Sequence, residues 1–445
     1  MIRPFAPAVL ALLVSVPAVA QVGSPAGPVP VDRLIARREA LAARIEGGVA
    51  ILRSADERPS EPPGSEYPQD AAFRQDSDFF YLTGLESHGS WLAIVARPGS
   101  PVEAHLFLPR RNPAEERWTG PTLGPGPEAA RITGIAAEMV HSSDSARAII
   151  GRLLGAAAGA GHSVWVRRMD RDTQDPLVRQ LVLERPGGSS KDLLPVLASL
   201  RLVKDADEIR RLRKAVEVSA AGHVAAIRET RPGSWEYEIE AAAEAAFRRG
   251  GAERLGYPSI VGSGVNGTIL HYDQNRRQAQ AGELVVMDMG AEYGYYTADI
   301  TRTIPVSGRF TRRQRALYDL VLGAQQAAMD SVRPGVTIAG LTRIARRYMS
   351  EHSGDLCGAE PCTRYFIHGL SHWIGMDVHD VGNYATALAP GMAFTIEPGI
   401  YIPEERIGIR IEDDVLVTET GYELLSRGLA RTAAEIEQLM AAKKP

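Results

Sequence analysis

The segments Gly282-Glu-Leu-Val-Val-Met-Asp288 and Gly391-Met-Ala-Phe-Thr-Ile-Glu397 decide the fold that we expect for the second part of the chain. Each places an acid six residues after a glycine, at the end of an apolar run typical of a buried strand. A histidine precedes each acid at a similar distance, His271 by 17 residues and His379 by 18. The two segments therefore look like copies of one pattern.

A second acid follows each of these segments. Asp299 lies 11 residues after Asp288, and Glu412 lies 15 residues after Glu397. The repeated order of histidine, strand acid and second acid indicates two related halves that face each other. We expect each half to contribute a pair of acids to one shared site.

The wider pattern predicts two domains. Residues 31–184 mix strand-like runs, such as residues 91–95, with helical stretches, which is typical of a smaller α/β domain. Residues 184–191 concentrate turn-forming and polar residues, so we expect a linker at 185–194 and the second domain at 195–440.

Three of the acids, Asp288, Glu397 and Glu412, lie within or at the end of apolar strand runs. Ionised groups are rarely buried there without a partner, because the desolvation of an isolated charge is costly. Arg302 and Arg410 could neutralise one or two of the acids as ion pairs. Four carboxylates and a histidine exceed what two arginines neutralise, so we expect metal ions.

Carboxylate oxygens and an imidazole are suitable ligands for hard or borderline divalent cations. This favours Mn²⁺ and leaves Co²⁺ or Zn²⁺ possible. Four negative charges call for two ions, and two ions about 3.5–4 Å apart can activate a water and polarise a carbonyl. The sequence thus predicts a two-metal hydrolytic site.

Three motifs of the second domain strongly resemble the aminopeptidase P and prolidase family. They are His368-Gly-Leu-Ser-His372-Trp-Ile-Gly-Met-Asp-Val-His379-Asp-Val-Gly382, Thr395-Ile-Glu-Pro-Gly-Ile-Tyr401 and Ile409-Arg-Ile-Glu-Asp-Asp414. Ile269-Leu-His-Tyr272 and Ala298-Asp-Ile-Thr-Arg-Thr303 extend the resemblance over essentially the whole domain.

The first domain resembles the family's N-terminal domain through Phe73-Arg-Gln-Asp-Ser-Asp-Phe-Phe-Tyr-Leu-Thr-Gly84. The resemblance as a whole implies an α+β protein of two domains. The first would be a creatinase-like α/β domain, and the second a pita-bread catalytic domain with pseudo-two-fold halves.

The resemblance also assigns residues to roles. Glu397 would shuttle protons, His379 would bind the substrate carbonyl, and His271 and His368 match other active-site histidines that bind substrate. Tyr401 belongs to the same motifs, Arg410 is a candidate for a substrate carboxylate, and Trp118 lies where family aminopeptidases tend to carry an aromatic. The implied metal ligands are Asp288, Asp299, His372, Glu397 and Glu412.

The activity expected from this resemblance is an Xaa-Pro aminopeptidase that acts on proline-containing peptides, as a homodimer or homotetramer. A prolidase or a proline-directed carboxypeptidase is the alternative, because only Gly-Asn-Tyr-Ala-Thr-Ala-Leu-Ala separates Val381 from Pro390. Bacterial aminopeptidases P usually have a longer loop there, with an arginine. A non-catalytic peptide-binding module is a further alternative, but such relatives have lost ligands that this chain retains.

The segment Gly262-Ser-Gly-Val-Asn-Gly267 fits G-x-G-x-x-G, which by itself would suggest a dinucleotide site. That fingerprint needs a following helix to bind the pyrophosphate. Residues 268–272 look like a strand instead, so we expect no nucleotide here.

Residues 1–20 have the features of a cleaved secretory signal: Arg3, an apolar run, and Ala18-Val-Ala20 before Gln21. The run is too short to anchor the chain in a bilayer, so we expect a periplasmic or secreted protein without a membrane span. A net charge of -4, with Lys and Arg dispersed among acids, gives no reason to expect nucleic acid.

Cys357 and Cys362 are the only cysteines. Behind a secretory signal, disulfides persist, so we expect the two to be bonded to each other. Free buried thiols are the alternative, since C-x4-C without a second pair is not a zinc spacing.

Overall fold

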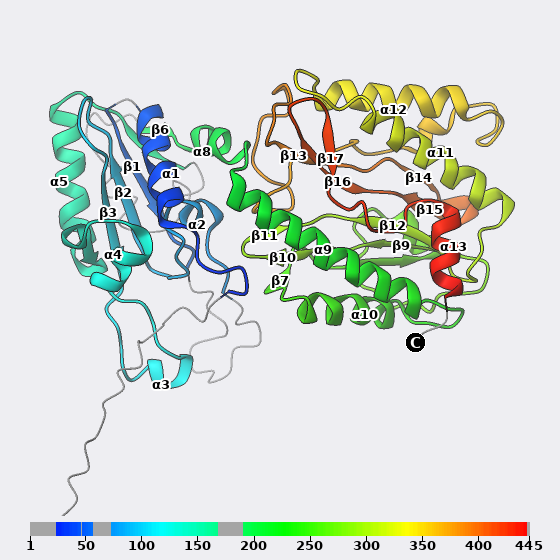
Figure 1. The fold of residues 1–445 in the computed structure, drawn as a ribbon, viewed down its shortest axis with the longest axis horizontal. Coiled ribbons are helices and arrows are strands. Elements are labelled where there is room, and N and C mark those ends of the chain that lie inside the picture. Colours follow the sequence, from blue (N-terminus) through cyan, green and yellow to red (C-terminus); the bar gives the residue numbers. More distant parts are fainter. Residues whose placement is uncertain (1–23, 46, 57–72, 168–189, 443–445) are drawn as a thin grey trace, which may run out of the picture.

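The structure is a computed structural model that describes residues 24–45, 47–56, 73–167 and 190–442. Within these residues the chain forms two domains side by side, with the helices α8 (Leu194–Arg201) and α9 (Ala206–Glu229) running from one to the other (Figure 1). This confirms the predicted two-domain architecture. The predicted signal peptide, residues 1–20, lies outside the described residues.

The N-terminal domain is built on a six-stranded sheet with the strand order β4-β3-β2-β1-β5-β6. β1 pairs antiparallel with β2 and parallel with β5. The strands are β1 (Val49–Arg53), β2 (Trp91–Val95), β3 (Glu103–Leu108), β4 (Val140–Ser142), β5 (Val164–Val166) and β6 (Ser190–Asp192). The helices are α1 (Val31–Arg44), α2 (Ser77–Thr83), α3 (Glu116–Thr119), α4 (Pro127–Thr133) and α5 (Ala146–Gly159).

Strand β1 shows how both faces of this sheet are covered. Ile51 belongs to the buried cluster that includes Ile150 of α5. Leu52, the next residue, belongs to the cluster that includes Leu34 of α1. Because successive side chains of a strand point to opposite faces, the sheet lies between α5 on one side and α1 on the other.

The boundary between the domains differs from the predicted linker at 185–194. Ser190–Asp192 form β6, which pairs with β5 at the edge of the N-terminal sheet, and α8 begins at Leu194. Residues 185–189 lie outside the described part of the chain. Pairing with an existing sheet edge gives the backbone groups of β6 hydrogen-bond partners, which composition alone does not reveal.

The second domain consists of two halves with the same order of elements, a helix pair followed by strands. Figure 1 shows the two helix pairs on opposite sides of the strands. The first half contains α9, α10 (Glu236–Arg249), β7 (Arg254–Leu255), β8 (Ile260–Ser263), β9 (Leu284–Asp288), β10 (Ala291–Tyr293), β11 (Tyr296–Thr297) and β12 (Thr301–Pro305). The second contains α11 (Arg312–Met329), α12 (Ile338–His352), β13 (Ala393–Ile396), β14 (Gly399–Ile402), β15 (Ile407–Arg410), β16 (Asp413–Val417), β17 (Tyr422–Leu424) and α13 (Ala433–Ala441).

One hydrophobic core runs through both halves. Val285 and Met287 of β9 belong to the same buried cluster as Phe394 and Ile396 of β13 and Leu317 of α11. These apolar side chains alternate along each strand with residues that face the other way. Shared packing therefore holds β9, which ends in Asp288, together with β13, which precedes Glu397.

The predicted strand at 268–272 is wrong. Gly264–Thr268 form a 3-10 helix, and no strand follows it before residue 277. The cause is the buried carboxylate of Glu236, which accepts hydrogen bonds from Ser263 N at 2.7 Å, Asn266 Nδ2 at 3.1 Å and the Tyr272 hydroxyl at 2.8 Å. These bonds curl the segment around one side chain, an interaction between distant residues that local patterns do not report.

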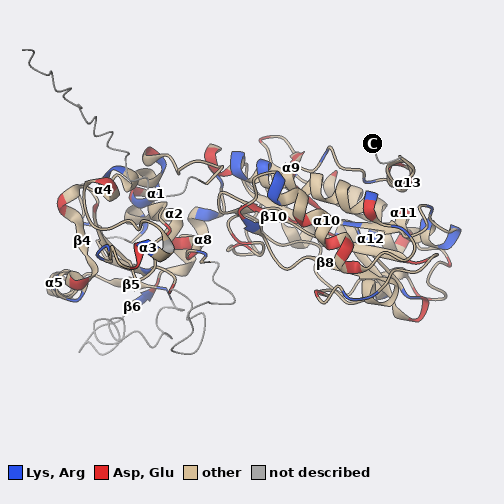
Figure 2. Cartoon of the chain, turned by 90° about the horizontal axis from the view of Figure 1, so that it is seen from below, with Lys and Arg blue, Asp and Glu red and all other residues tan. Residues whose placement is uncertain are grey.

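Acidic and basic residues are interspersed over both domains (Figure 2), in keeping with the net charge of -4. Across the described ranges, no helix combines the length and the apolar character needed to cross a membrane.

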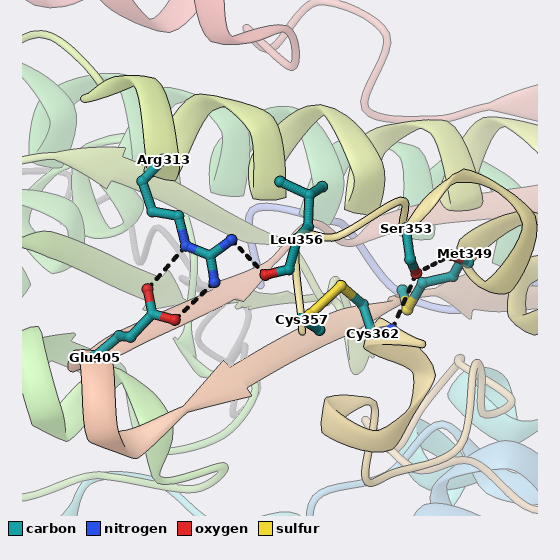
Figure 3. Close-up of a disulfide and its surroundings, with 7 residues drawn as sticks. All are labelled: Arg313, Met349, Ser353, Leu356, Cys357, Cys362 and Glu405. Atoms are coloured by element: carbon teal, nitrogen blue, oxygen red, sulfur yellow. Dashed lines mark hydrogen bonds and ion pairs between the residues drawn. A yellow bond between two sulfur atoms is a disulfide. The ribbon is translucent and has the colours of Figure 1, made fainter. Parts of the chain in front are cut away.

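The structure joins Cys357 to Cys362 between α12 and the 3-10 helix Cys362–Tyr365 (Figure 3). The Ser353 hydroxyl accepts a hydrogen bond from the backbone N–H of Cys362 at 2.9 Å. Arg313, which donates to the carbonyl of Leu356 just before Cys357, binds Glu405 at 2.6 Å (Figure 3). The link thus closes a short loop six residues before His368.

Candidate active site

Asp288 and Asp299 come from the first half of the second domain. Asp288 ends β9, which pairs antiparallel with β12 so that Thr301 lies opposite Asp288. Asp299 lies two residues before Thr301 in the chain. The two carboxylates therefore start from the same end of this sheet.

His372, Glu397 and Glu412 come from the second half. Glu397 directly follows β13, and Glu412 lies between β15 and β16. The backbone N–H of Glu412 donates to the carbonyl of Thr301 at 3.1 Å, which forms an isolated antiparallel bridge between the halves. This bridge brings the acids of the two halves to one place.

The distances around His372 define the centre of the cluster. Its Nε2 lies 3.2 Å from Asp299 Oδ2, 3.7 Å from Glu397 Oε1 and 3.9 Å from Glu412 Oε1. The hydroxyl of Tyr257 lies 2.6 Å from a carboxylate oxygen of Asp288 and 2.6 Å from one of Asp299. All five predicted metal ligands thus gather within one site.

The donor set fits divalent metal ions. Among the residues that the structure describes, histidines are the only basic side chains within 4.0 Å of the carboxylates of Asp299, Glu397 and Glu412, and no lysine or arginine pairs with them. Glu412 Oε1 is buried and has no hydrogen-bond partner in the described part of the chain. Buried carboxylates without a counter-charge are costly, and oxygen-rich sets with one imidazole suit hard or borderline cations.

The electrostatics of the cluster point the same way. Burial raises the pKa of Asp299 and of Glu412 well above the ordinary range, and the neighbouring carboxylates raise both further. Burial likewise raises the pKa of Glu397 to about 7. Like charges crowded in a buried space favour protonation, and a bound cation relieves that repulsion.

Arg410 and Arg302, the two possible structural counter-ions, differ in what they contact. Arg410 Nη2 donates to Asp288 Oδ2 at 2.6 Å. Arg302 pairs with Asp413 at 2.6 Å, which is not a predicted ligand, and both of these side chains are fully buried. The ion-pair alternative therefore holds for Asp288 alone.

The guanidinium group of Arg410 is hydrogen-bonded to other side chains of the protein. Its Nε donates to Thr301 Oγ1 at 3.1 Å and its Nη1 to the Tyr401 hydroxyl at 3.0 Å, while Nη2 binds Asp288. The residue is 3% exposed. All three guanidinium nitrogens have partners, so its contact with a substrate carboxylate stays a prediction, and its observed role is to orient Asp288 and Tyr401.

Several residues that support the ligands were not predicted from the sequence. Thr301 Oγ1 donates to Glu412 Oε2 at 2.6 Å, and Asp414 Oδ2 accepts from the backbone N–H of Asp299 at 3.0 Å. Both residues lie inside the quoted motifs, two residues after a ligand, which is a usable signal. Tyr257 carries no such signal, because an isolated tyrosine has no local pattern.

The other predicted histidines lie beside the cluster. The ring of His379 lies 4.1 Å from that of His372, centroid to centroid. Burial lowers the pKa of His379, and the nearby imidazoles of His372 and His271 lower it further. His368 Nε2 lies 2.8 Å from the Tyr401 hydroxyl, and its Nδ1 lies 3.7 Å from Glu397.

The protonation state of His368 follows from its surroundings. Burial lowers its pKa to about 4, and the charge of Arg410 adds to this. Near neutral pH the imidazole is therefore uncharged, so one ring nitrogen can donate and the other can accept.

Trp118 lies apart from these residues. It is on α3 of the N-terminal domain and is 88% exposed. In both views α3 lies within that domain, away from the strands of the second domain (Figures 1 and 2). The predicted substrate contact of Trp118 stays a prediction.

Comparison with known proteins agrees with this geometry. Residues 210–419 match metallopeptidase family M24, and residues 34–160 match the aminopeptidase P N-terminal domain. The Xaa-Pro aminopeptidase of Escherichia coli (strain K12) is 36% identical over 439 residues, covering 92% of this chain and 97% of the relative. Xaa-Pro aminopeptidase 3 of Homo sapiens is 30% identical over 392 residues, covering 82% of this chain and 76% of the relative.

Solved structures give the same result. The Zn-substituted aminopeptidase P of E. coli in complex with product matches with a TM-score of 0.85 at 34% identity, over 94% of this chain and 100% of that one. The E. coli enzyme with the inhibitor Pro-Leu matches with a TM-score of 0.84 at 34% identity, over 93% and 99%. The creatinase-like domain and the pita-bread domain are thereby confirmed. The chain belongs to metallopeptidase family M24 and carries the N-terminal domain of aminopeptidase P.

Proposed function

We propose that this chain is an Xaa-Pro aminopeptidase that hydrolyses the bond before a proline in the second position. The observation that carries this is the buried set of Asp299, His372 and Glu412, whose ligand atoms lie within 4.8 Å of one another. We propose two divalent ions as cofactors, with Mn²⁺ preferred and Co²⁺ or Zn²⁺ as alternatives.

The two ions would be held by Asp288, Asp299, His372, Glu397 and Glu412. The bound ions would supply Lewis-acid polarisation of the scissile carbonyl and a lower pKa for the attacking water. The short contacts of Tyr257, Thr301 and Arg410 with the carboxylates support this set, because such partners fix the orientation of ligands.

Glu397 is the proposed proton shuttle. Its side chain is 17% exposed, more than that of Asp299 or Glu412, so it is the acid best able to reach a water in the site. Glu397 would take a proton from the water as its oxygen bonds to the carbonyl carbon. It would then give that proton to the proline nitrogen as the C–N bond breaks, which releases the N-terminal residue.

Three histidines would hold the substrate. His379 would donate a hydrogen bond to the carbonyl oxygen as negative charge develops there. His271 and His368 would contact the peptide on either side, with Tyr401 fixing the ring of His368 through their 2.8 Å contact. An uncharged His368 is consistent with a pKa lowered to about 4 by burial.

The likeness to the E. coli enzyme supports this assignment of substrate. That protein has been solved with product and with the inhibitor Pro-Leu, a dipeptide that begins with proline. The product that we propose for this chain, a peptide with N-terminal proline, has the same chemistry.

The test is a comparison of three peptides with purified protein and added Mn²⁺. We expect Gly-Pro-Ala to give glycine and Pro-Ala, identified by mass. Cleavage of Gly-Pro alone would point to a prolidase, and release of proline from Ala-Gly-Pro would point to a carboxypeptidase. Absence of cleavage in all three would contradict the proposed function.

A prolidase remains the second candidate because of the short segment between Val381 and Pro390. Its turn is closed within itself, with Asn383 O accepting from Thr386 N at 2.9 Å and Asn383 Oδ1 accepting from Ala385 N at 2.9 Å. A shorter loop changes the walls that would contact longer substrates. The peptide comparison above separates the two activities.

We also propose that the mature protein begins near Gln21, in the periplasm or outside the cell, and assembles as a homodimer or homotetramer. The sequence of residues 1–20 supports the processed start and the location. N-terminal sequencing and light scattering of the purified protein test the two points. An uncleaved leader or a monomer would contradict them.

A further inference from the structure

The loop between His372 and Asp380 returns to its starting point. The backbone N–H of Asp380 donates to the carbonyl of Trp373 at 2.9 Å. The return brings His379 beside His372, with their rings 4.1 Å apart. His372 is held at the base of the loop by Thr395, whose backbone N–H donates to the His372 carbonyl at 3.0 Å. His379 is the exposed end of the pair.

Arg201 of α8 binds two acids that flank His379. Its Nη2 donates to Asp377 Oδ2 at 2.8 Å and to Asp380 Oδ1. Its Nη1 donates to Asp78 Oδ1 at 2.7 Å, on α2 of the N-terminal domain. The side chain of Arg201 is 2% exposed, so these charge-assisted bonds are shielded from water.

Further contacts fasten the same loop to the N-terminal domain. Ser77 Oγ donates to Asp377 Oδ1 at 2.8 Å, and Arg74 Nη2 donates to the carbonyl of Met376 at 2.6 Å. On the other side of His379, Lys204 lies 3.3 Å from Asp380. The loop is thus held before and after His379 by residues outside its own half of the domain.

We propose that Arg201 and Asp377 are positioning residues through which the N-terminal domain sets the place of His379 against the substrate carbonyl. His372 needs no such help, because its backbone is fixed by β13. The inference rests on the proposed function for the role of His379. It adds a task for the N-terminal domain, whose fold is otherwise separate from the chemistry.

Asp377→Ala tests this with a matched control, Glu86→Ala. Both acids make contacts between the domains, and their side chains are 38% and 40% exposed. Glu86 instead binds Arg254 at 3.0 Å and accepts from the Tyr295 hydroxyl at 2.5 Å, both of which lie outside the loop of His379. We expect Asp377→Ala to lower kcat about tenfold or more with KM changed less than about threefold, because a small misplacement of a catalytic group is costly. Glu86→Ala should leave both constants unchanged.

A double-mutant cycle separates positioning from general damage. In a His379→Ala background, Asp377→Ala should lower kcat less than about twofold. The effects of two substitutions are not additive when one residue acts through the other. A full tenfold loss there, or an equal loss in Glu86→Ala, would overturn the inference. Similar melting temperatures for the two single variants would show that stability is not the cause.

A second readout does not depend on turnover. In protein labelled at histidine Cε1, the NMR signal of His379 is identified by its loss in His379→Ala. It should shift in Asp377→Ala and stay in place in Glu86→Ala. An unmoved signal in Asp377→Ala would overturn the inference, even if the peptide assay fails for the wild type and the proposed function falls separately.

Discussion

Two groups of buried acids in this chain are stabilised in different ways. At the domain interface, Asp78 and Asp380 are almost fully buried and lie beside Arg201, and Asp380 also lies beside Lys204. In the centre of the second domain, Asp299 and Glu412 are equally buried. Within the described residues, histidine is the only basic side chain that pairs with the central acids.

The difference teaches which group does chemistry. Arginine and lysine neutralise the interface acids permanently, so those acids are structural. In the described part of the chain no lysine or arginine lies within ion-pair distance of Asp299 or Glu412, which leaves their charge available to bind cations. A buried carboxylate therefore indicates a metal centre only after its partners have been counted.

Metal removal should produce the largest contrast between the two groups. Chelation followed by dialysis should abolish hydrolysis of Gly-Pro-Ala, and Mn²⁺ or Co²⁺ should restore it, because the reaction needs the ions for its nucleophile. The interface carries its own cations, so circular dichroism should show that the fold persists. Full activity in protein found metal-free by mass spectrometry would contradict the mechanism.

Glu397→Gln should lower kcat by several orders of magnitude. The amide nearly matches the carboxylate in shape, so the fold should persist, but it cannot accept the proton and binds metal more weakly. Glu86→Gln is the matched control at the interface, where one amide oxygen can still accept from both Arg254 and the Tyr295 hydroxyl, so kcat should stay unchanged. A Glu397→Gln variant with near wild-type kcat would remove Glu397 from the reaction.

His379→Ala should lower kcat by roughly 10² to 10³ and leave both metals bound, since loss of one donor to the developing oxyanion has about that cost. His372→Ala should instead lose metal, because His372 Nε2 lies 3.2 Å from Asp299 at the centre of the cluster. Metal analysis of both variants decides between them. Loss of metal from His379→Ala with retention in His372→Ala would reverse the assignment of ligand and donor.

Arg201→Met tests the interface alone. Removing this cation leaves Asp78 and Asp380 buried without their main partner, so the free energy of unfolding should fall by about 3–5 kcal/mol. Denaturant melts at neutral pH measure this. The metal content of the folded protein should not change, and a variant that lost its metal would show that the two groups are coupled.

The sequence predicted the centre of the site better than its surroundings. Asp288 and Glu397 were predicted because a charged side chain at the end of an apolar run is unusual. In both segments the acid also lies six residues after a glycine. The strand that ends in Asp288 and the strand that precedes Glu397 followed from their apolar runs. The fold of 264–272 was missed, because it depends on Glu236, which is distant in the chain.

Arg201 was missed for the same physical reason. It stands in a helix among ordinary residues, and its importance arises only when Asp78 and Asp377 are brought to it from two domains. Trp118 was named from its position in the chain. The fold leaves it exposed on α3, so its contact with substrate stays a prediction.

The smallest expected effect concerns the covalent link between Cys357 and Cys362, near Arg313. Non-reducing peptide mapping of the mature protein should recover Cys357 joined to Cys362, and two alkylatable thiols would refute the pairing. The closed loop spans a sequence separation of 5, and so short a loop constrains the unfolded chain only modestly. Replacing both cysteines by alanine should therefore cost about 2 kcal/mol of unfolding free energy.

Glu405→Ala provides the control for this last measurement. It breaks the ion pair between Arg313 and Glu405. The side chains of Arg313 and Glu405 are 34% and 40% exposed. A pair in that setting is screened by water, so its loss should cost less than about 1 kcal/mol. If Glu405→Ala destabilised the protein as much as removal of both cysteines, the link would add nothing beyond an exposed ion pair. Covalent closure would then not be what stabilises this segment ahead of His368.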